Sequence, residues 1–88
     1  MKIKRTGVHY AYIVKCADGT YYTGYTPDLA RRIHLHNTGK GAKYTRGRGP
    51  VILVWCQEYR SRSRALSEEA MVKKMTRVGK ERLIKNGE

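Results

Sequence analysis

Five side chains of this sequence carry groups that could act together on one phosphate: two phenols, a guanidinium, an imidazole and a carboxylate. They belong to Tyr12, Tyr22, Arg32, His36 and Glu69. An arginine offers two phosphate oxygens a forked, permanently charged pair of donors. One carboxylate can hold Mg²⁺ or Mn²⁺ when water and phosphate complete the shell. Taken singly, these residues also have ordinary explanations: a cross-strand aromatic pair, a solvated helix face, and an ion pair between Glu69 and Lys73.

The spacing of these residues resembles that of the GIY-YIG nuclease family. Tyr-Thr-Gly at residues 22–24 looks like the second signature of the family, and Tyr-Ala-Tyr at residues 10–12 occupies the place of the first. Arg32 lies ten residues beyond the start of the second signature and His36 lies four further, as in the family. Glu69, on a helix predicted after a long strand, corresponds to the acidic metal ligand of the family. The resemblance covers almost the whole chain.

Two positions depart from the family pattern. Tyr10 and Ala11 replace the Gly and Ile that name the first signature, whose tyrosine is present as Tyr12. Three residues after the start of the second signature, where the excision-repair branch has a lysine, this sequence has Tyr25. Assistance by a lysine is therefore not expected there, and His36 is the better candidate to assist deprotonation.

The resemblance implies a structure-directed DNA endonuclease that uses one divalent ion, Mg²⁺ or Mn²⁺, held by Glu69. Phosphodiester hydrolysis needs a positioned nucleophile, neutralised charge on the phosphate and a stabilised leaving oxygen. Arg32 is expected to bind the phosphate. Tyr12 is expected to act as the base with help from His36, while Tyr22 hydrogen-bonds the attacking water or the phosphate. Since a free phenol has a pKa of about 10, we expect the nearby cations to favour the phenolate. A role in DNA repair or recombination follows from the same resemblance.

The charge of the chain indicates a polyanionic partner. Nineteen Lys and Arg face seven Asp and Glu, which gives a formal net charge of +12. Excess positive charge opposes compaction, whereas neutralising phosphates releases counterions and drives binding to nucleic acid. Two other functions stay open: a non-catalytic nucleic-acid-binding module on a nuclease-like scaffold, and a ribosome- or RNA-associated basic protein.

Residues 37–50 are interpreted as a DNA clamp, because they are dense in glycine and in cations. This stretch is similar to the small stand-alone bacterial members of the family and to the eukaryotic junction-resolving nuclease subunit. Glycine permits close backbone approach, and an aromatic ring can stack on an unpaired base. The predicted DNA contacts are Lys40, Lys43, Tyr44, Arg46, Arg48, Arg62 and Arg64. The alternative is a flexible, solvated loop.

Contacts of this kind position the DNA backbone without selecting its sequence. We therefore expect the structure of the DNA to be recognised, with branched or single-stranded DNA as the substrate. A protein partner that presents the substrate is a further expectation.

The strands that must position these residues are predicted from two patterns. Residues 8–16 and 21–25 are rich in aromatic and β-branched side chains and flank an Asp18-Gly19 turn, which predicts an antiparallel hairpin. The nearly continuous apolar run at residues 51–59 predicts a central strand buried on both faces. The expected fold class is α/β of the α+β type: a three-stranded, mainly antiparallel sheet flanked by helices in the order β-β-α-β-α-α.

Three helices are expected to flank this sheet. Thr26 is predicted to cap the first, with Pro27 at its first position and residues 37–39 ending it. The second starts at residues 61–63 and runs to about residue 75, and Thr76 caps the third. The predicted core contacts of the last two helices are Leu66, Ala70, Met71, Val78, Leu83 and Ile84.

One domain is predicted over residues 1–88, with a basic arm at residues 1–7 and a core at about 8–85. No apolar run approaches the ~18 residues of a membrane span, and no signal peptide opens the chain. We therefore expect a cytoplasmic protein without membrane contact.

The cysteines and the remaining histidines are not expected to build a site. Cys16 and Cys56 are predicted to be buried free thiols, because neither belongs to a Cys-x-x-Cys pair. His34 is expected on the surface, and His9 is given no role. A zinc site made from His9, His34 and His36 is not expected, because the spacing of zinc ligands is missing.

Overall fold

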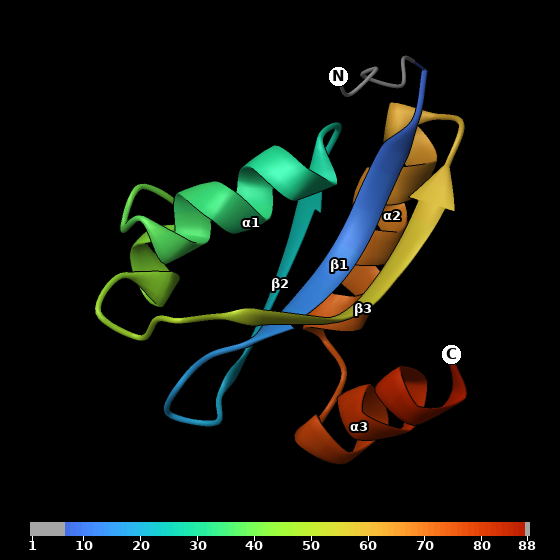
Figure 1. Ribbon diagram of the computed structural model, residues 1–88. Helices are drawn as coiled ribbons and strands as arrows, with labels where there is room; N and C mark the ends of the chain where they lie inside the picture. The colour runs from blue at the N-terminus through green and yellow to red at the C-terminus, as the bar shows by residue number, and fades with distance from the viewer. Residues whose placement is uncertain (1–6, 88) are drawn as a thin grey trace.

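The computed structural model describes residues 7–87, which form a three-stranded antiparallel sheet with three α-helices (Figure 1). The elements are β1 His9–Lys15, β2 Tyr21–Thr26, α1 Leu29–Asn37, the 3₁₀ turn η1 Lys43–Thr45, β3 Ile52–Tyr59, α2 Arg62–Lys73 and α3 Arg77–Asn86. The predicted order β-β-α-β-α-α and the antiparallel hairpin of β1 and β2 are thus confirmed. Most of the predicted basic arm, residues 1–6, lies outside the described residues.

The central strand of the sheet is β1, because the strand order is β2-β1-β3. The prediction that residues 51–59 form the central strand is wrong: β3 lies at an edge, and of its residues only Trp55 is buried. Ile13 of β1 pairs with Trp55 of β3 and Val14 pairs with Leu53, so Val54 has no partner on β1. This bulge interrupts the regular alternation of β3 side chains between the two faces of the sheet. An apolar run of this length therefore did not require burial on both sides, and Ile52 remains 64% exposed.

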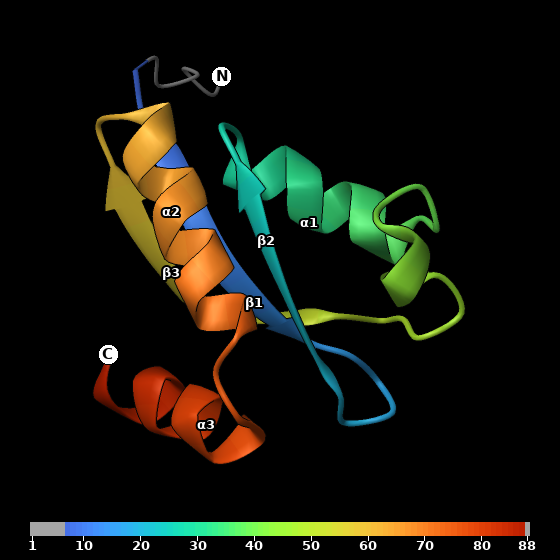
Figure 2. The same cartoon turned by 180° about the vertical axis from the view of Figure 1, so that it is seen from behind.

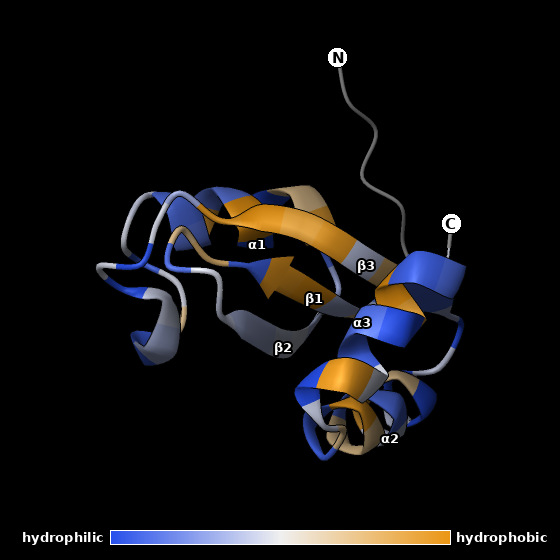
Figure 3. Ribbon diagram, turned by 90° about the horizontal axis from the view of Figure 1, so that it is seen from below, coloured by the Kyte–Doolittle hydropathy of each residue, from blue (hydrophilic) through white to orange (hydrophobic). Residues whose placement is uncertain are grey.

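The helices cover opposite faces of the sheet. Figures 1 and 2 show α1 on one face and α2 on the other, and Figure 3 shows α1 and α2 on either side of the strands. Alternation along β1 sends Tyr12 and Val14 to the α1 face and Ala11 and Ile13 to the face of α2 and α3. All four of these side chains are completely buried, so β1 carries the core of both layers.

The helix starts follow from capping side chains, with one change from the prediction. The first helix is capped by Asp28, whose carboxylate accepts from the Arg31 amide at 3.3 Å. Thr26 instead ends β2, and its hydroxyl oxygen accepts from the Asp28 amide at 3.1 Å. The predicted starts of the other two helices are confirmed, because Ser61 caps α2 and Thr76 caps α3. Asp28 is the better cap because its charge also complements the positive end of the helix.

The apolar faces of α2 and α3 differ from those predicted. Helix α2 turns Ala65 and Val72 into the core, whereas the predicted contacts Leu66, Ala70 and Met71 are exposed. These three residues lie within a short stretch of a helix with little amphipathic pattern, so their spacing did not define its buried side.

On α3 two of the three predicted core contacts are observed. Leu83 and Ile84 pack against the core cluster around Trp55, while Val78 is exposed. The cysteines are both free, but only Cys16 is buried and Cys56 is exposed on the edge strand. In the described part of the chain, no helix has the length and apolar character that crossing a bilayer requires.

Candidate active site

The first feature of the site is a phenol lying across a glycine. The register of the hairpin places Tyr12 opposite Gly24, and an added β-carbon on Gly24 would lie 2.5 Å from the Tyr12 hydroxyl oxygen. A side chain at this position would therefore displace the phenol, since real β-carbons do not approach that closely. The glycine of the second signature thus allows the Tyr12 side chain to cross the edge strand.

Helix α1 brings two of the predicted residues to the same phenol. Arg32 and His36 lie one turn apart on this helix. The His36 Nε2 atom lies 2.8 Å from the Tyr12 hydroxyl oxygen, and the Arg32 Nε donates to that oxygen at 3.4 Å. A guanidinium and an imidazole therefore converge on one oxygen.

Tyr22 joins this group from β2. Its ring centroid lies 6.4 Å from that of Tyr12 and 5.4 Å from that of His36. Tyr12 is completely buried, whereas Tyr22 is half-buried. Tyr22 is thus the phenol of the pair that is more open to solvent.

Burial controls the electrostatics of the two central groups. It raises the pKa of the Tyr12 phenol; the hydrogen bond and charge of Arg32 oppose this rise, and the charges of Tyr22 and Glu69 add to it. Burial, followed by the charge of Arg32, lowers the pKa of His36. The expectation that nearby cations favour the phenolate is therefore right in direction for Arg32, but burial outweighs it in the free protein. His36 is neutral at pH 7.

Glu69 approaches from the other layer of the molecule. Figure 2 shows β2, the edge strand, passing between α1 and α2, and the Glu69 charge is felt by the Tyr12 phenol. The Glu69 side chain is only 16% exposed, and it forms an ion pair with Lys73 at 3.1 Å. The ordinary explanation for Glu69 is thus observed. Its charge acts on the Tyr12 phenol, while α2 lies on the opposite face of the sheet from α1, which carries Arg32 and His36.

The loop from residue 37 to residue 50 is anchored at several points. The Asn37 side chain bonds both the amide and the carbonyl of Val51, at 2.6 and 3.3 Å. The Ala17 amide donates to the Arg48 carbonyl at 2.7 Å. A β-carbon on Gly41 would lie 2.8 Å from the His36 α-carbon, so the loop backbone packs directly on the imidazole. The segment is thus held to the rest of the protein at these points, while most of its residues are exposed.

Two of the predicted DNA contacts on this loop are engaged within the protein. The Tyr44 ring stacks on Tyr22, with centroids 5.9 Å apart and planes at 26°. The Arg48 guanidinium carbon lies 4.6 Å from the centre of the Tyr44 ring, and Arg48 also forms an ion pair with Asp18. Stacking of Tyr44 on an unpaired base would therefore have to compete with these contacts, which sequence spacing did not reveal.

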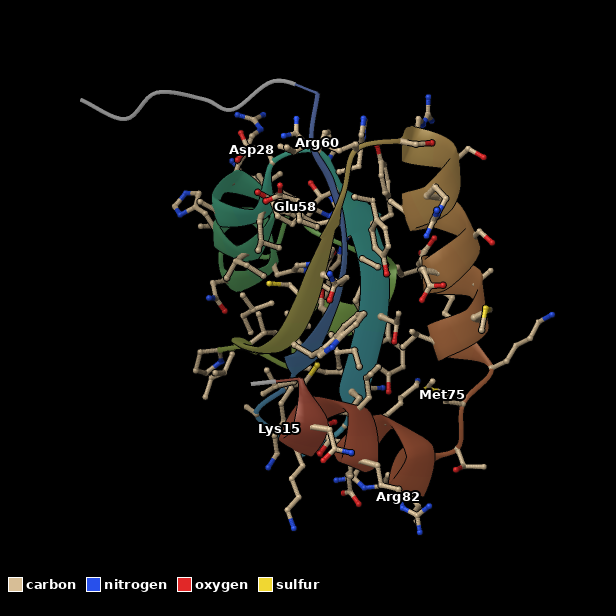
Figure 4. All side chains as sticks on the ribbon, turned by 90° about the vertical axis from the view of Figure 1, so that its right-hand side faces the viewer. Lys15, Asp28, Glu58, Arg60, Met75 and Arg82 are labelled. Carbon is tan, nitrogen blue, oxygen red and sulfur yellow. The ribbon has the colours of Figure 1, made fainter. Side chains whose placement is uncertain are left out.

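The other predicted DNA contacts fall into two groups at opposite ends of β3. Lys40, Lys43 and Arg46 are exposed on the loop before the strand. Arg62 and Arg64 are exposed at the start of α2, after it. An eight-residue strand separates the groups by roughly 25 Å. In Figure 4, Arg60 and Lys15 mark these two ends of the sheet. The predicted DNA contacts thus lie toward both ends of β3.

Two contacts near the site involve residues that sequence reasoning missed. Thr45, 1% exposed, places its hydroxyl oxygen 2.8 Å from the Nδ1 atom of His36. His9 bonds the Tyr25 hydroxyl at 2.7 Å and stacks on its ring. No spacing rule identifies Thr45, because the loop that carries it has no helical or strand periodicity.

A comparison with protein families decides the relationship of this chain. The model of the GIY-YIG catalytic domain matches residues 8–82. The chain belongs to the GIY-YIG family. The resemblance to this family that the sequence indicated is therefore confirmed.

Several GIY-YIG relatives are similar over most of their length. A UPF0213 protein of Halobacterium salinarum is 50% identical over 77 residues, which cover 88% of this chain and 100% of the relative. A UPF0213 protein of Streptococcus pneumoniae is 49% identical over 75 residues, which cover 85% and 76%.

Two solution NMR structures share the fold. A UPF0213 protein from Bacillus halodurans is 51% identical with a TM-score of 0.60, covering 91% of this chain and 86% of that one. A protein from E. faecalis is 42% identical with a TM-score of 0.63, covering 94% and 88%.

GIY-YIG nucleases generally use a divalent metal, and the residues of this chain fit an ion with few protein ligands. Within residues 7–87, no group of three or more His, Cys, Asp and Glu side chains has the arrangement of a metal site. Glu69, whose charge acts on the Tyr12 phenol, is the carboxylate of the predicted set, and Mg²⁺ is commonly bound through one or two carboxylates with water and substrate phosphate.

Proposed function

We propose that this GIY-YIG protein is a divalent-metal-dependent endonuclease that hydrolyses phosphodiester bonds in DNA. The observation that carries the proposal is the convergence of Arg32 and His36 on the Tyr12 hydroxyl oxygen, at 3.4 and 2.8 Å. A buried phenol needs a hydrogen-bond partner, which His36 supplies; the guanidinium is the additional group, and it can bind a phosphate. Catalysis of hydrolysis needs both a proton acceptor and a fixed positive charge at the phosphate.

Tyr12 acts as the base toward the attacking water, and His36 receives the phenol proton. Because the pKa of Tyr12 is raised and that of His36 is lowered, the two proton transfers occur together. The water oxygen bonds to phosphorus as Tyr12 takes its proton, and the bond from phosphorus to the leaving oxygen breaks. No free phenolate has to accumulate in the buried site.

Arg32 binds the phosphate and gives access to Tyr12. Its Nε now lies on the phenol oxygen, and its terminal nitrogens can form a forked contact with two phosphate oxygens. As Arg32 turns toward the phosphate, it uncovers the Tyr12 hydroxyl. Tyr22, half-buried beside this opening, hydrogen-bonds the attacking water or the phosphate.

Glu69 would hold the Mg²⁺ or Mn²⁺ ion, because such an ion needs few protein ligands when water and phosphate oxygens are available. The ion, when bound, stabilises the charge on the leaving oxygen. Lys73 has to give up its ion pair with the Glu69 carboxylate for this to happen.

The substrate is DNA selected by its structure, such as a branch or a single strand. The exposed cations of the loop and of α2 meet phosphates at two separated places, and phosphate contacts position DNA without reading its sequence. The roughly 25 Å between these groups suits a substrate that extends or bends across the sheet. A cytoplasmic role in DNA repair or recombination, with a protein that presents the substrate, is part of the same proposal.

The test is a set of labelled flaps, splayed arms, junctions and single strands, incubated with and without Mg²⁺ or Mn²⁺. The wild-type protein is expected to nick at least one of them only with metal, while Glu69→Ala and Arg32→Ala are inactive. Glu69→Ala is expected to keep most of the DNA affinity, since Glu69 contributes no positive charge. Equal cleavage by wild type and Glu69→Ala would assign the activity to a contaminant and refute the proposal.

A non-catalytic nucleic-acid-binding module is the second candidate. The complete burial of Tyr12 and the ion pair of Glu69 with Lys73 favour it. Such a protein binds with a steep salt dependence and needs no metal. Competition between structured RNA and branched DNA separates this candidate from an RNA-associated protein.

A further inference from the structure

A buried line of hydrogen bonds connects Tyr12 to the backbone of the loop after α1. The Tyr12 hydroxyl lies 2.8 Å from His36 Nε2, and His36 Nδ1 lies 2.8 Å from the Thr45 hydroxyl oxygen. The Thr45 hydroxyl in turn donates to the Ala42 carbonyl at 2.9 Å. The exposed fractions of Tyr12, His36 and Thr45 are 0%, 2% and 1%.

The hydrogen bonds of the Thr45 hydroxyl determine which ring nitrogen of His36 carries the proton. A hydroxyl has a single proton to donate, and that of Thr45 is directed to the Ala42 carbonyl. Toward His36, the Thr45 oxygen is therefore an acceptor, so Nδ1 must carry hydrogen. Since the buried ring is neutral, Nε2 then has a free lone pair facing Tyr12.

The hydrogen bonds of the Tyr12 hydroxyl independently require the same tautomer of His36, with hydrogen on Nδ1. Arg32 is only a donor, so it cannot receive the phenol proton. Among the described hydrogen-bond partners of the Tyr12 oxygen, His36 Nε2 is the remaining acceptor. The opposite tautomer would point two hydrogens at one another between His36 and Tyr12 or leave a buried phenol proton without a partner.

We propose that Thr45 is a positioning residue that holds His36 in the Nδ1–H tautomer, so that Nε2 is open to receive the Tyr12 proton. Thr45 contacts no substrate in this role; it acts through His36. The consequence for cleavage rests on the endonuclease proposal, whereas the tautomer is a property of the folded protein.

The loop geometry supports a dedicated role for this hydroxyl. Thr45 lies in η1, and its amide also donates to the Ala42 carbonyl at 3.0 Å, so this turn fixes both groups of the residue. Gly41 lets the same loop press against the imidazole. A threonine held by its own backbone turn is well placed to impose a hydrogen-bond direction on the ring.

The experiment compares the wild type with Thr45→Val, Thr45→Ser and Thr38→Ala. Valine keeps the shape of threonine but cannot accept a hydrogen bond. Serine retains the hydroxyl and reports whether function is rescued. Thr38→Ala removes an exposed hydroxyl at the end of α1 and serves as the control. Amide NMR spectra first establish which variants fold.

The first measurement is the ¹⁵N chemical shifts of the His36 ring nitrogens, without DNA. Wild type, Thr45→Ser and Thr38→Ala are expected to show a protonated Nδ1 and an unprotonated Nε2, and Thr45→Val a mixture or the reverse. The proposal is overturned if the wild type has its proton on Nε2, or if folded Thr45→Val keeps the wild-type tautomer. Should Thr45→Val fail to fold, the wild-type and Thr45→Ser spectra still decide the assignment.

The second measurement is DNA cleavage. Thr45→Val is expected to lose about tenfold to hundredfold in kcat with KM little changed, because a residue behind a functional side chain orients that side chain. Serine is expected to restore most of the activity. If the wild type has the expected tautomer but cuts no DNA, the endonuclease proposal fails while the role of Thr45 as holder of the tautomer stands. Full activity of folded Thr45→Val would refute the positioning role.

Discussion

The hydroxyl of Tyr12 occupies the space that a β-carbon on Gly24 would need, since the two atoms would lie 2.5 Å apart. Gly24→Ala is therefore expected to push the phenol away from His36 and to destabilise the fold by about 1–3 kcal/mol. Cleavage is expected to fall more steeply than stability, because catalytic geometry tolerates little displacement. Urea unfolding and the nuclease assay, run on the same preparations, measure the two effects.

Gly79→Ala is the matched control for this substitution. Gly79 lies in α3 and an added β-carbon there would make only ordinary contacts, the nearest at 3.4 Å. Alanine is favoured over glycine in a helix by up to about 1 kcal/mol, so this variant is expected to be as stable as the wild type or more so. A Gly24→Ala protein with unchanged stability and activity would show that the Tyr12 side chain is free to move.

The neutral, buried state of His36 predicts how stability depends on pH. Because burial and Arg32 lower the pKa of His36 in the folded state, the unfolded chain binds a proton first as the pH falls. The stability linked to His36 is thus complete above pH ~6.5 and is lost as the pH falls from there toward the folded-state pKa. His36→Gln is expected to lose less stability than the wild type between pH 7 and pH 5, measured as the free energy of unfolding in urea.

His34→Gln provides the comparison, because His34 lies exposed on the same helix. It is expected to keep the wild-type pH dependence. If His36→Gln and His34→Gln behave alike, the imidazole of His36 is not held neutral by its surroundings. The acid side of the cleavage profile is expected to follow the same titration, since a protonated His36 cannot receive the Tyr12 proton.

The sequence predicted the parts of the site that regular elements position. The spacing from Tyr22 to Arg32 and His36 is meaningful because a hairpin leads directly into a helix, which presents residues four apart on one face. The pairing of Tyr12 with Gly24 was not among these predictions, although it follows from the short turn between β1 and β2. Local chain geometry was therefore sufficient for these contacts.

The features that were missed depend on packing between distant segments. Thr45 reaches His36 only because the irregular loop folds back onto α1, and β3 lies at an edge because β1 pairs on both sides. The buried face of α2, with Ala65 and Val72, was likewise set by the sheet rather than by the pattern of the helix. Neither a loop path nor a strand order is encoded in periodicity.

The ion pair of Asp18 with Arg48 predicts an effect on DNA affinity. Asp18 keeps Arg48 over the Tyr44 ring and places a negative charge beside the loop cations. Asp18→Asn is expected to free Arg48 for phosphate, to tighten DNA binding several-fold and to steepen the dependence of log K on log salt by about one phosphate contact. Fluorescence anisotropy across a salt series measures both quantities.

Glu58→Gln makes the same change in net charge at the other end of β3 (Figure 4). It is expected to have the smaller effect on affinity. Equal tightening by the two variants would mean that net charge alone matters and that Arg48 gains no phosphate contact.

The ion pair of Lys73 with Glu69 predicts how the metal requirement can be changed. Lys73 competes with a cation for the Glu69 carboxylate, at 3.1 Å, from an exposed position near the end of α2. Lys73→Ala is expected to lower the Mn²⁺ concentration for half-maximal cleavage by a few-fold, whereas Lys74→Ala, the neighbouring exposed lysine, leaves it unchanged. Added Mn²⁺ is expected to broaden the amide NMR signals around Glu69, which gives a measurement that needs no DNA. In Lys73→Ala this broadening is expected to begin at a lower Mn²⁺ concentration than in the wild type. In Glu69→Gln it is expected to disappear. Glutamine has the shape of glutamate but lacks the negative charge that holds a divalent cation. Broadening that persists in Glu69→Gln would therefore show that the ion binds at another place.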